Sequence, residues 1–166
     1  STSGVLQWHT FLGGSGTEEG YSIAVDGSGN VYVAGISSAT WGTPARAYSA
    51  SFDAFAAKLN SSGVLQWNTF LGSSGYDQGA AIAVDDSGNM YLAGYSTASW
   101  GAPVQAYSAG VDAFVAMLAP SSTVTFAANG GSGSMSNQVA SSATALTTNT
   151  FTRANYTFTG WNTVAL

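Results

Sequence analysis

Short runs of alternating apolar and polar residues, separated by turns rich in glycine and asparagine, make up most of the chain. Residues 21–26 (Y-S-I-A-V-D) are followed by G-S-G-N and then by residues 31–35 (V-Y-V-A-G). Two β-rich runs around such a turn are typical of a β-hairpin, because Gly29 and Asn30 can adopt the left-handed backbone conformations that the turn requires. No segment here keeps the 3.6-residue period of a helix, so the pattern predicts strands.

A second hairpin follows after a long loop, and the whole pattern then occurs again. Residues 53–59 (D-A-F-A-A-K-L) and residues 64–72 (V-L-Q-W-N-T-F-L-G) flank the turn N-S-S-G. The sequence aligns with itself at a period of 59 residues without gaps, so that Trp8 falls on Trp67. A long fixed period of this kind indicates a propeller, a solenoid or a similar array.

Both faces of the predicted sheet are apolar, with Ile23 and Val25 on one side and the small Ala24 on the other. A sheet of this kind must pack between neighbours, as propeller blades do. Residues 36–52 would then form a loop over the rim. We therefore predict an all-β fold with β-propeller-type four-stranded antiparallel blades, built from two repeats of 59 residues, and a short C-terminal β segment.

The first repeat carries the series T-F-L-G-G-S-G-T-E-E-G-Y-S-I-A-V-D-G-S-G-N-V-Y-V-A-G, followed by T-P, A-Y and D-A-F-A-A-K-L-N-S-S-G. This series resembles the SBBP repeat, a bacterial β-propeller repeat, and the resemblance covers residues 3–118. It implies a propeller fold and a secreted or cell-surface setting. The family has no assigned catalytic activity that could be carried over to this chain.

From residue 123 the composition changes to threonine, serine and asparagine, and the 59-residue period ends. The pattern A-N-G-G, M, N, F, R and then Y-T-F-T-G-W-N-T resembles the Listeria–Bacteroides (InlB B-type) repeat, a small β-rich module of bacterial surface proteins. The resemblance stops before the last strand of that module. We therefore expect two propeller-blade repeats at residues 1–119 and an incomplete small β module at residues 120–166.

Charge excludes several kinds of partner. Only 7% of the residues are charged, against about 25% in an average protein. Arg46, Lys58 and Arg153 are the only basic residues besides one histidine, so no surface could neutralise a run of phosphates, and we expect no nucleic-acid partner. No apolar run approaches the ~20 residues of a membrane helix, so we expect no membrane insertion. The surplus of small polar residues favours an extracellular or cell-surface location.

The sequence offers few candidate residues for catalysis or metal binding. The lone histidine, His9, is replaced by Asn68 one repeat later, and there is no cysteine. We therefore predict no catalytic site, no cofactor and no zinc or redox-metal site. The loops that begin at Asp26 and Asp85 resemble calcium loops, but each offers only one or two carboxylates, whereas calcium prefers several. A carboxylate that caps the hairpin turn is the favoured interpretation of both.

Aromatic residues of the two long loops are the candidates for ligand binding. Trp41 and Tyr48 in the first repeat correspond to Trp100 and Tyr107 in the second. These side chains could form platforms on which surface glycans stack, or they could pack over the ends of the blades. Packing is the favoured interpretation.

The two matching strands each carry one tryptophan and one large apolar neighbour. We expect Trp8 and Trp67 to be buried in equivalent places beside Phe11 and Phe70. If so, replacing either tryptophan by alanine would cost about 3–5 kcal/mol of stability.

The arrangement of the strands raises a question of assembly. Residues 62–72 repeat residues 3–13 with a single difference. Residues 20–72 supply four strands, whereas residues 79–118 supply three. Two blades are too few for a closed propeller, and Val5–Leu12 is a spare copy of the missing strand.

We therefore expect a non-catalytic structural or assembly module of a secreted or cell-surface bacterial protein, which self-associates by strand exchange into a ring or a filament. The partner would be a second copy of the chain. Two alternatives remain open: a carbohydrate- or ligand-binding propeller, and a fragment of a longer surface adhesin array. The residues expected in the assembly strand are Val5, Leu6, Trp8, Phe11 and Leu12.

Overall fold

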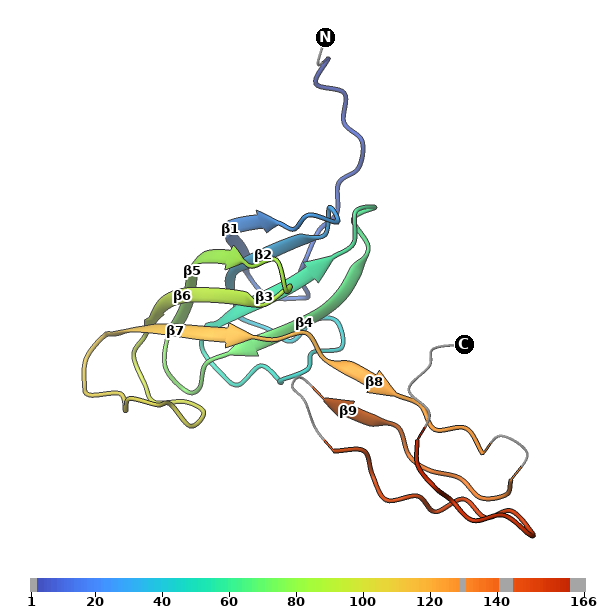
Figure 1. Ribbon diagram of the computed structural model, residues 1–166. Coiled ribbons are helices and arrows are strands. Elements are labelled where there is room, and N and C mark those ends of the chain that lie inside the picture. Colours follow the sequence, from blue (N-terminus) through green and yellow to red (C-terminus); the bar gives the residue numbers. More distant parts are fainter. Residues whose placement is uncertain (1–2, 129–130, 141–144, 162–166) are drawn as a thin grey trace. The chain divides into compact units, whose positions relative to one another are not determined.

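The computed structural model describes residues 3–128, 131–140 and 145–161. The chain divides into two compact units, residues 1–118 and residues 119–166. The described residues contain strands and no helix, and hence no helix that could cross a membrane (Figure 1). The strands are β1 (Glu18–Val25), β2 (Val31–Ser37), β3 (Asp53–Leu59), β4 (Leu65–Leu71), β5 (Asp77–Val84), β6 (Met90–Ser96), β7 (Asp112–Leu118), β8 (Ser122–Val124) and β9 (Gln138–Ala140).

The first unit consists of two antiparallel sheets in meander order. Strands β1-β2-β3-β4 form the first sheet, called blade 1, and β5-β6-β7 form the second, called blade 2. The two blades share a bulge in their first strand, at Tyr21 in β1 and at Ala80 in β5. The all-β fold and the propeller-type strand order predicted from the sequence are confirmed.

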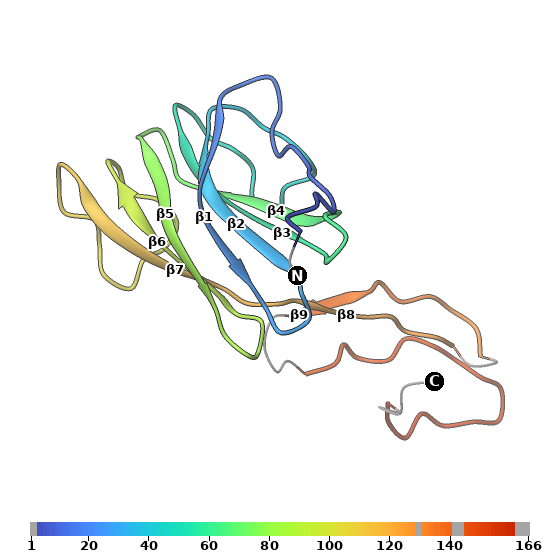
Figure 2. The same ribbon diagram turned by 90° about the horizontal axis from the view of Figure 1, so that it is seen from above.

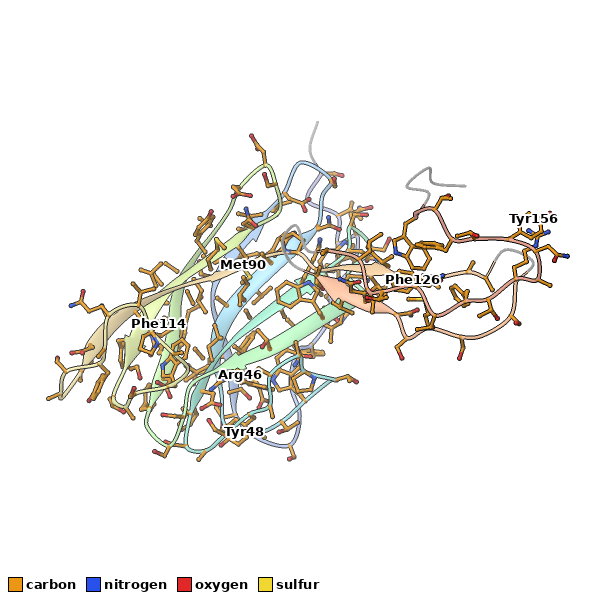
Figure 3. All side chains as sticks on the ribbon, turned by 60° about the horizontal axis from the view of Figure 1, so that its bottom comes forward. Arg46, Tyr48, Met90, Phe114, Phe126 and Tyr156 are labelled. Carbon is orange, nitrogen blue, oxygen red and sulfur yellow. The ribbon has the colours of Figure 1, made fainter. Side chains whose placement is uncertain are left out.

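The blades stack face to face, with β5 against β1, β2 and β3 (Figure 2). Tyr32, Ala34 and Ala56 of blade 1 are buried in this contact, where they meet Met90 and Leu92 of blade 2 (Figure 3). Burial of side chains of this size stabilises the fold by about 1.5–3 kcal/mol for each large residue. The face of blade 1 toward blade 2 is thus packed, as the sequence predicts for a blade, whereas Ile23 and Val25 on the opposite face are 67% and 60% exposed.

The other face of blade 1 has a core of its own. Phe55 of β3 and Phe70 of β4 are buried there and meet the ring of Trp41 edge-on, at centroid distances of 5.3 and 5.9 Å. Gly35 makes room for Phe55, because a Cβ at this glycine would lie only 2.8 Å from Cε1 of the Phe55 ring. The two blades repeat this pair, with Gly94 beneath Phe114.

The second unit holds the two-stranded sheet of β8 and β9 and a bridge between Ser132 and Thr152. Its aromatic cluster is centred on Trp161, whose ring lies 4.8 Å from that of Phe126 and 4.9 Å from that of Phe158. A cluster of a few aromatic residues is a small core for a unit of this size.

Candidate functional site

The outer strand of blade 1 is held by the loop that crosses the rim. This rim loop, residues 38–52, joins β2 to β3. The backbone N–H of Ala45 donates to the Asn68 carbonyl at 2.9 Å, and the N–H of Phe70 donates to the Arg46 carbonyl at 3.2 Å. The buried Asn68 side chain also donates, through Nδ2, to the Trp41 carbonyl at 2.8 Å. Strand β4 therefore bonds β3 on one side and the rim loop on the other.

Arg46 clamps the end of β4. Its Nη1 donates to the Phe70 carbonyl at 2.9 Å and its Nη2 to the Gly72 carbonyl at 2.6 Å. The guanidinium also lies 5.7 Å from the ring centroid of Trp100 in blade 2 (Figure 3). In the sequence, Arg46 stands out only as one of three basic residues, and its bonds to β4 were not predicted. The one sequence feature that could have indicated this role is a difference between the repeats, since position 105 of the second repeat is glutamine.

Blade 2 has the same parts but no fourth strand. Among the described residues, β6 is the only strand that pairs with β7, so the other edge of β7 is open. Beside this edge lies a cavity of about 670 Å³, lined by the rim loop of blade 2 (residues 97–111), including Trp100 and Tyr107, and by Phe114 of β7. One repeat earlier, the equivalent three aromatic residues surround Phe70 of β4. The cavity therefore occupies the place that a fourth strand fills in blade 1.

The N-terminal segment, residues 3–12, forms no strand and runs as an extended tail (Figure 1). Leu12 packs against the cluster of Phe55 and Phe70, and the Trp8 indole N–H donates to the Ser61 carbonyl at 3.2 Å. Val5, Leu6 and Phe11 are exposed, Phe11 to 92%. The segment therefore lies along blade 1 by one side and leaves the other side uncovered.

The structure corrects the expectation for the tryptophans. Trp8 is 40% exposed and the neighbouring Phe11 is almost fully exposed, so this pair is not buried. Trp67 packs with Tyr32 on the face toward blade 2, whereas Phe70 lies on the opposite face. Residues three apart in a strand point to opposite sides, which is why Trp67 and Phe70 cannot be neighbours in one core.

The aromatic residues of the rim loops pack against the blades and are not exposed as platforms for a ligand. Trp41 is 5% exposed and packs against Phe55 and Phe70, so its ring has no free face on which a sugar could stack. Tyr48 packs edge-on against Phe70 and donates its hydroxyl to the Ser51 carbonyl. Trp100 and Tyr107 are half-buried beside the cavity of blade 2.

The hairpin aspartates use their oxygens within their own turns. Oδ1 of Asp26 accepts the backbone N–H groups of Ser28 and Asn30, and Oδ2 accepts Asn30 Nδ2 and the Tyr32 hydroxyl. Asp85 repeats the pattern, and these bonds hold the pKa of both carboxyl groups below the ordinary value, the amide of the following asparagine contributing most. This geometry is that of a capping carboxylate rather than of a calcium ligand.

Two further aspartates, which sequence reasoning did not pair, are buried at the join between the blades. A Cβ at Gly72 would lie 2.5 Å from an oxygen of Asp53 and 2.5 Å from an oxygen of Asp77. Burial raises the pKa of Asp53, against the bonds that its carboxylate accepts from Ser49. Within the part of the chain that the structure describes, no group of three or more acidic, histidine or cysteine side chains is placed to hold a metal.

A four-stranded meander stacked on a three-stranded meander of the same register defines an all-β repeat protein of the propeller-blade class. Residues 7–40 and 66–99 match the SBBP beta-propeller repeat, and residues 123–165 match the Listeria-Bacteroides repeat domain. The chain therefore carries two SBBP repeats followed by one Listeria-Bacteroides repeat, as the sequence pattern predicts. Repeats of both kinds are found in bacterial surface or extracellular proteins. No curated protein sequence matches the chain.

Proposed function

We propose that this chain is a non-catalytic structural module of a bacterial surface or extracellular protein, and that it self-associates by strand exchange. In this assembly the N-terminal segment of one copy becomes the fourth strand of blade 2 in a second copy. The observation that carries the proposal is the match between an open edge and a spare strand. Within the described residues, no strand pairs with the outer edge of β7, and the chain holds a second copy of the β4 sequence outside both sheets.

The side chains of the N-terminal segment support this pairing. Residues alternate along β4, so that Asn68 and Phe70 point into the rim side of blade 1 while Leu71 points toward blade 2. In the N-terminal segment, Leu12 packs against blade 1, whereas Phe11 is 92% exposed. Phe11 would therefore enter the cavity of blade 2 as Phe70 fills the same place in blade 1.

The pairing also covers an exposed strand edge. An exposed strand edge beside exposed apolar residues promotes uncontrolled association, and natural sheets cover such edges. Addition of a strand covers the edge with backbone hydrogen bonds, while the alternate side chains supply specificity. The two SBBP matches begin at equivalent positions, residues 7 and 66, so the N-terminal segment belongs to the repeat pattern in the same way as β4.

Light scattering on the full chain and on a variant without residues 1–12 tests the proposal. The full chain is expected to form a dimer or larger assembly at micromolar concentration, and the deletion variant to be monomeric. Adding a synthetic peptide of residues 1–13 to the deletion variant should occupy blade 2 and protect the amides of β7 from hydrogen exchange. A monomeric full chain, or a deletion variant that assembles unchanged, would contradict strand exchange and would favour a segment of a longer array.

A further inference from the structure

The outer face of blade 2 is apolar and exposed. Tyr91 of β6 and Val115 and Met117 of β7 lie on the side of the sheet that points away from blade 1, and Val115 is 78% exposed. One repeat earlier, the equivalent Tyr32 and Ala56 are buried against blade 2, at 1% and 0%. A face that has the pattern of a buried face is therefore open to solvent.

Blade 1 carries the complementary face. Ile23 and Val25 of β1 lie on the side away from blade 2 and are 67% and 60% exposed. Their equivalents in blade 2, Ile82 and Val84, pack against the buried cluster that contains Tyr32. The chain thus contains one complete blade-to-blade contact and both unmatched halves of a second one.

The linkers decide how a donated strand would be oriented. Residues 72–76 join β4 to β5, and residues 13–17 join the N-terminal segment to β1, so the two linkers have the same length. Leu71 of β4 packs with Leu92 of the next blade, and Leu12 packs in the same manner against the cluster of blade 1. The N-terminal segment is therefore already placed relative to blade 1 as β4 is placed relative to blade 2.

We propose that a second copy of the chain docks its blade 1 face to face on the outer face of blade 2, with Ile23 and Val25 against Tyr91, Val115 and Met117. This contact rests on the strand exchange proposed above, because the copy that donates the strand is the one whose blade 1 the short linker delivers. The contact continues the blade stack from one copy to the next. It joins different surfaces of the two copies, so it propagates into a closed ring or an open filament.

A charge placed at the centre of the outer face tests the docking. Val115→Asp is expected to raise the midpoint concentration of assembly at least tenfold in sedimentation velocity, because the carboxylate would be buried without a partner. Val115→Ala is the matched control and should assemble like the wild-type chain, since alanine is the residue at position 56 of the internal contact. Because Val115 is exposed in the single chain, both variants should unfold at the wild-type temperature when monomeric.

Disulfide trapping gives a second measurement, since the chain has no cysteine. A mixture of Ile23→Cys and Val115→Cys chains should form a heterodimeric disulfide on mild oxidation. A mixture of Ile23→Cys and Val64→Cys, with the second cysteine at an exposed position of blade 1 beside the turn before β4, should not. If Val115→Asp assembles like the wild type and no crosslink forms, while deletion of residues 1–12 still abolishes assembly, the docking is overturned and strand exchange stands. A wild-type chain that stays monomeric at every concentration overturns both.

Discussion

One substitution, made separately in the two copies of a strand, distinguishes folding from assembly. Phe70 is fully buried in the core of blade 1 and packs against Trp41, Phe55 and Tyr48. Truncation of such a side chain removes its burial and leaves a cavity, so Phe70→Ala should lower the free energy of unfolding by about 3–5 kcal/mol. Phe11 is 92% exposed, and Phe11→Ala should leave the unfolding of the single chain unchanged within about 0.5 kcal/mol.

Phe11→Ala should instead weaken the proposed assembly. In the strand-exchanged state Phe11 would be surrounded by Trp100, Tyr107 and Phe114, the equivalents of the residues around Phe70. Phe11→Ala would then weaken the free energy of association by the same amount, about 3–5 kcal/mol. This corresponds to a dissociation constant raised roughly 100-fold to a few thousand-fold. Urea unfolding at a concentration where the chain is monomeric measures the first effect, and sedimentation equilibrium measures the second.

Two results would refute this reasoning. If Phe11→Ala lowers the stability of the single chain as much as Phe70→Ala does, the N-terminal segment is part of the fold of blade 1. If Phe11→Ala leaves the dissociation constant unchanged, its ring does not enter the cavity of blade 2.

Two further predictions concern polar groups. Gln105→Arg gives blade 2 the clamp that Arg46 provides in blade 1, and two bonds from a guanidinium to strand carbonyls should tighten association about tenfold or more in sedimentation equilibrium; an unchanged constant would mean that the added strand does not follow the path of β4. Asp85 has a pKa below the ordinary 3.8, so its turn contributes stability at neutral pH that is lost as the pH falls through the folded-state pKa. Asp85→Asn should therefore lower the melting temperature at pH 7, and this deficit should shrink as the pH falls through the folded-state pKa, whereas the control Asp86→Asn should change little at any pH. A deficit for Asp85→Asn that does not shrink as the pH is lowered would contradict the assignment.

Much of the fold follows from the sequence, because each hairpin has local signals. The turns after Asp26 and Asp85 contain glycine and asparagine at the required places, and a gapless period of 59 residues shows that both blades share one register. The count of four strands in one blade and three in the other also follows from this period. These features depend on neighbours in sequence, which is why they could be predicted.

The parts of the site that depend on the path of the rim loop could not be predicted. Whether Trp41 faces solvent or the core is decided by where residues 38–52 cross β4, and no local pattern specifies that crossing. Arg46 bonds backbone carbonyls, which every residue has, so its partners leave no mark on the sequence. The opposite orientation of Trp67 and Phe70, in contrast, follows from the two-residue period of a strand and was available from the sequence.

The two repeats differ at the residues that form the blade contacts, so the contact within a chain and the proposed contact between copies differ in strength. Inside the chain, β4 is clamped by Arg46, and Lys58 lies 5.2 Å from the ring centroid of Tyr32 at the blade contact. At the equivalent places of blade 2 stand Gln105 and Met117, which carry no charge.

A charge-assisted bond to a carbonyl is roughly twice as strong as a neutral one, so the contact within a chain would exceed the contact between copies even where the shapes are the same. Association between copies also costs the translational and rotational entropy of a separate molecule. The contact within a chain has no such cost. In the proposed assembly the blade pair is therefore the permanent unit, and the joint between copies is the place where a ring or filament opens and closes.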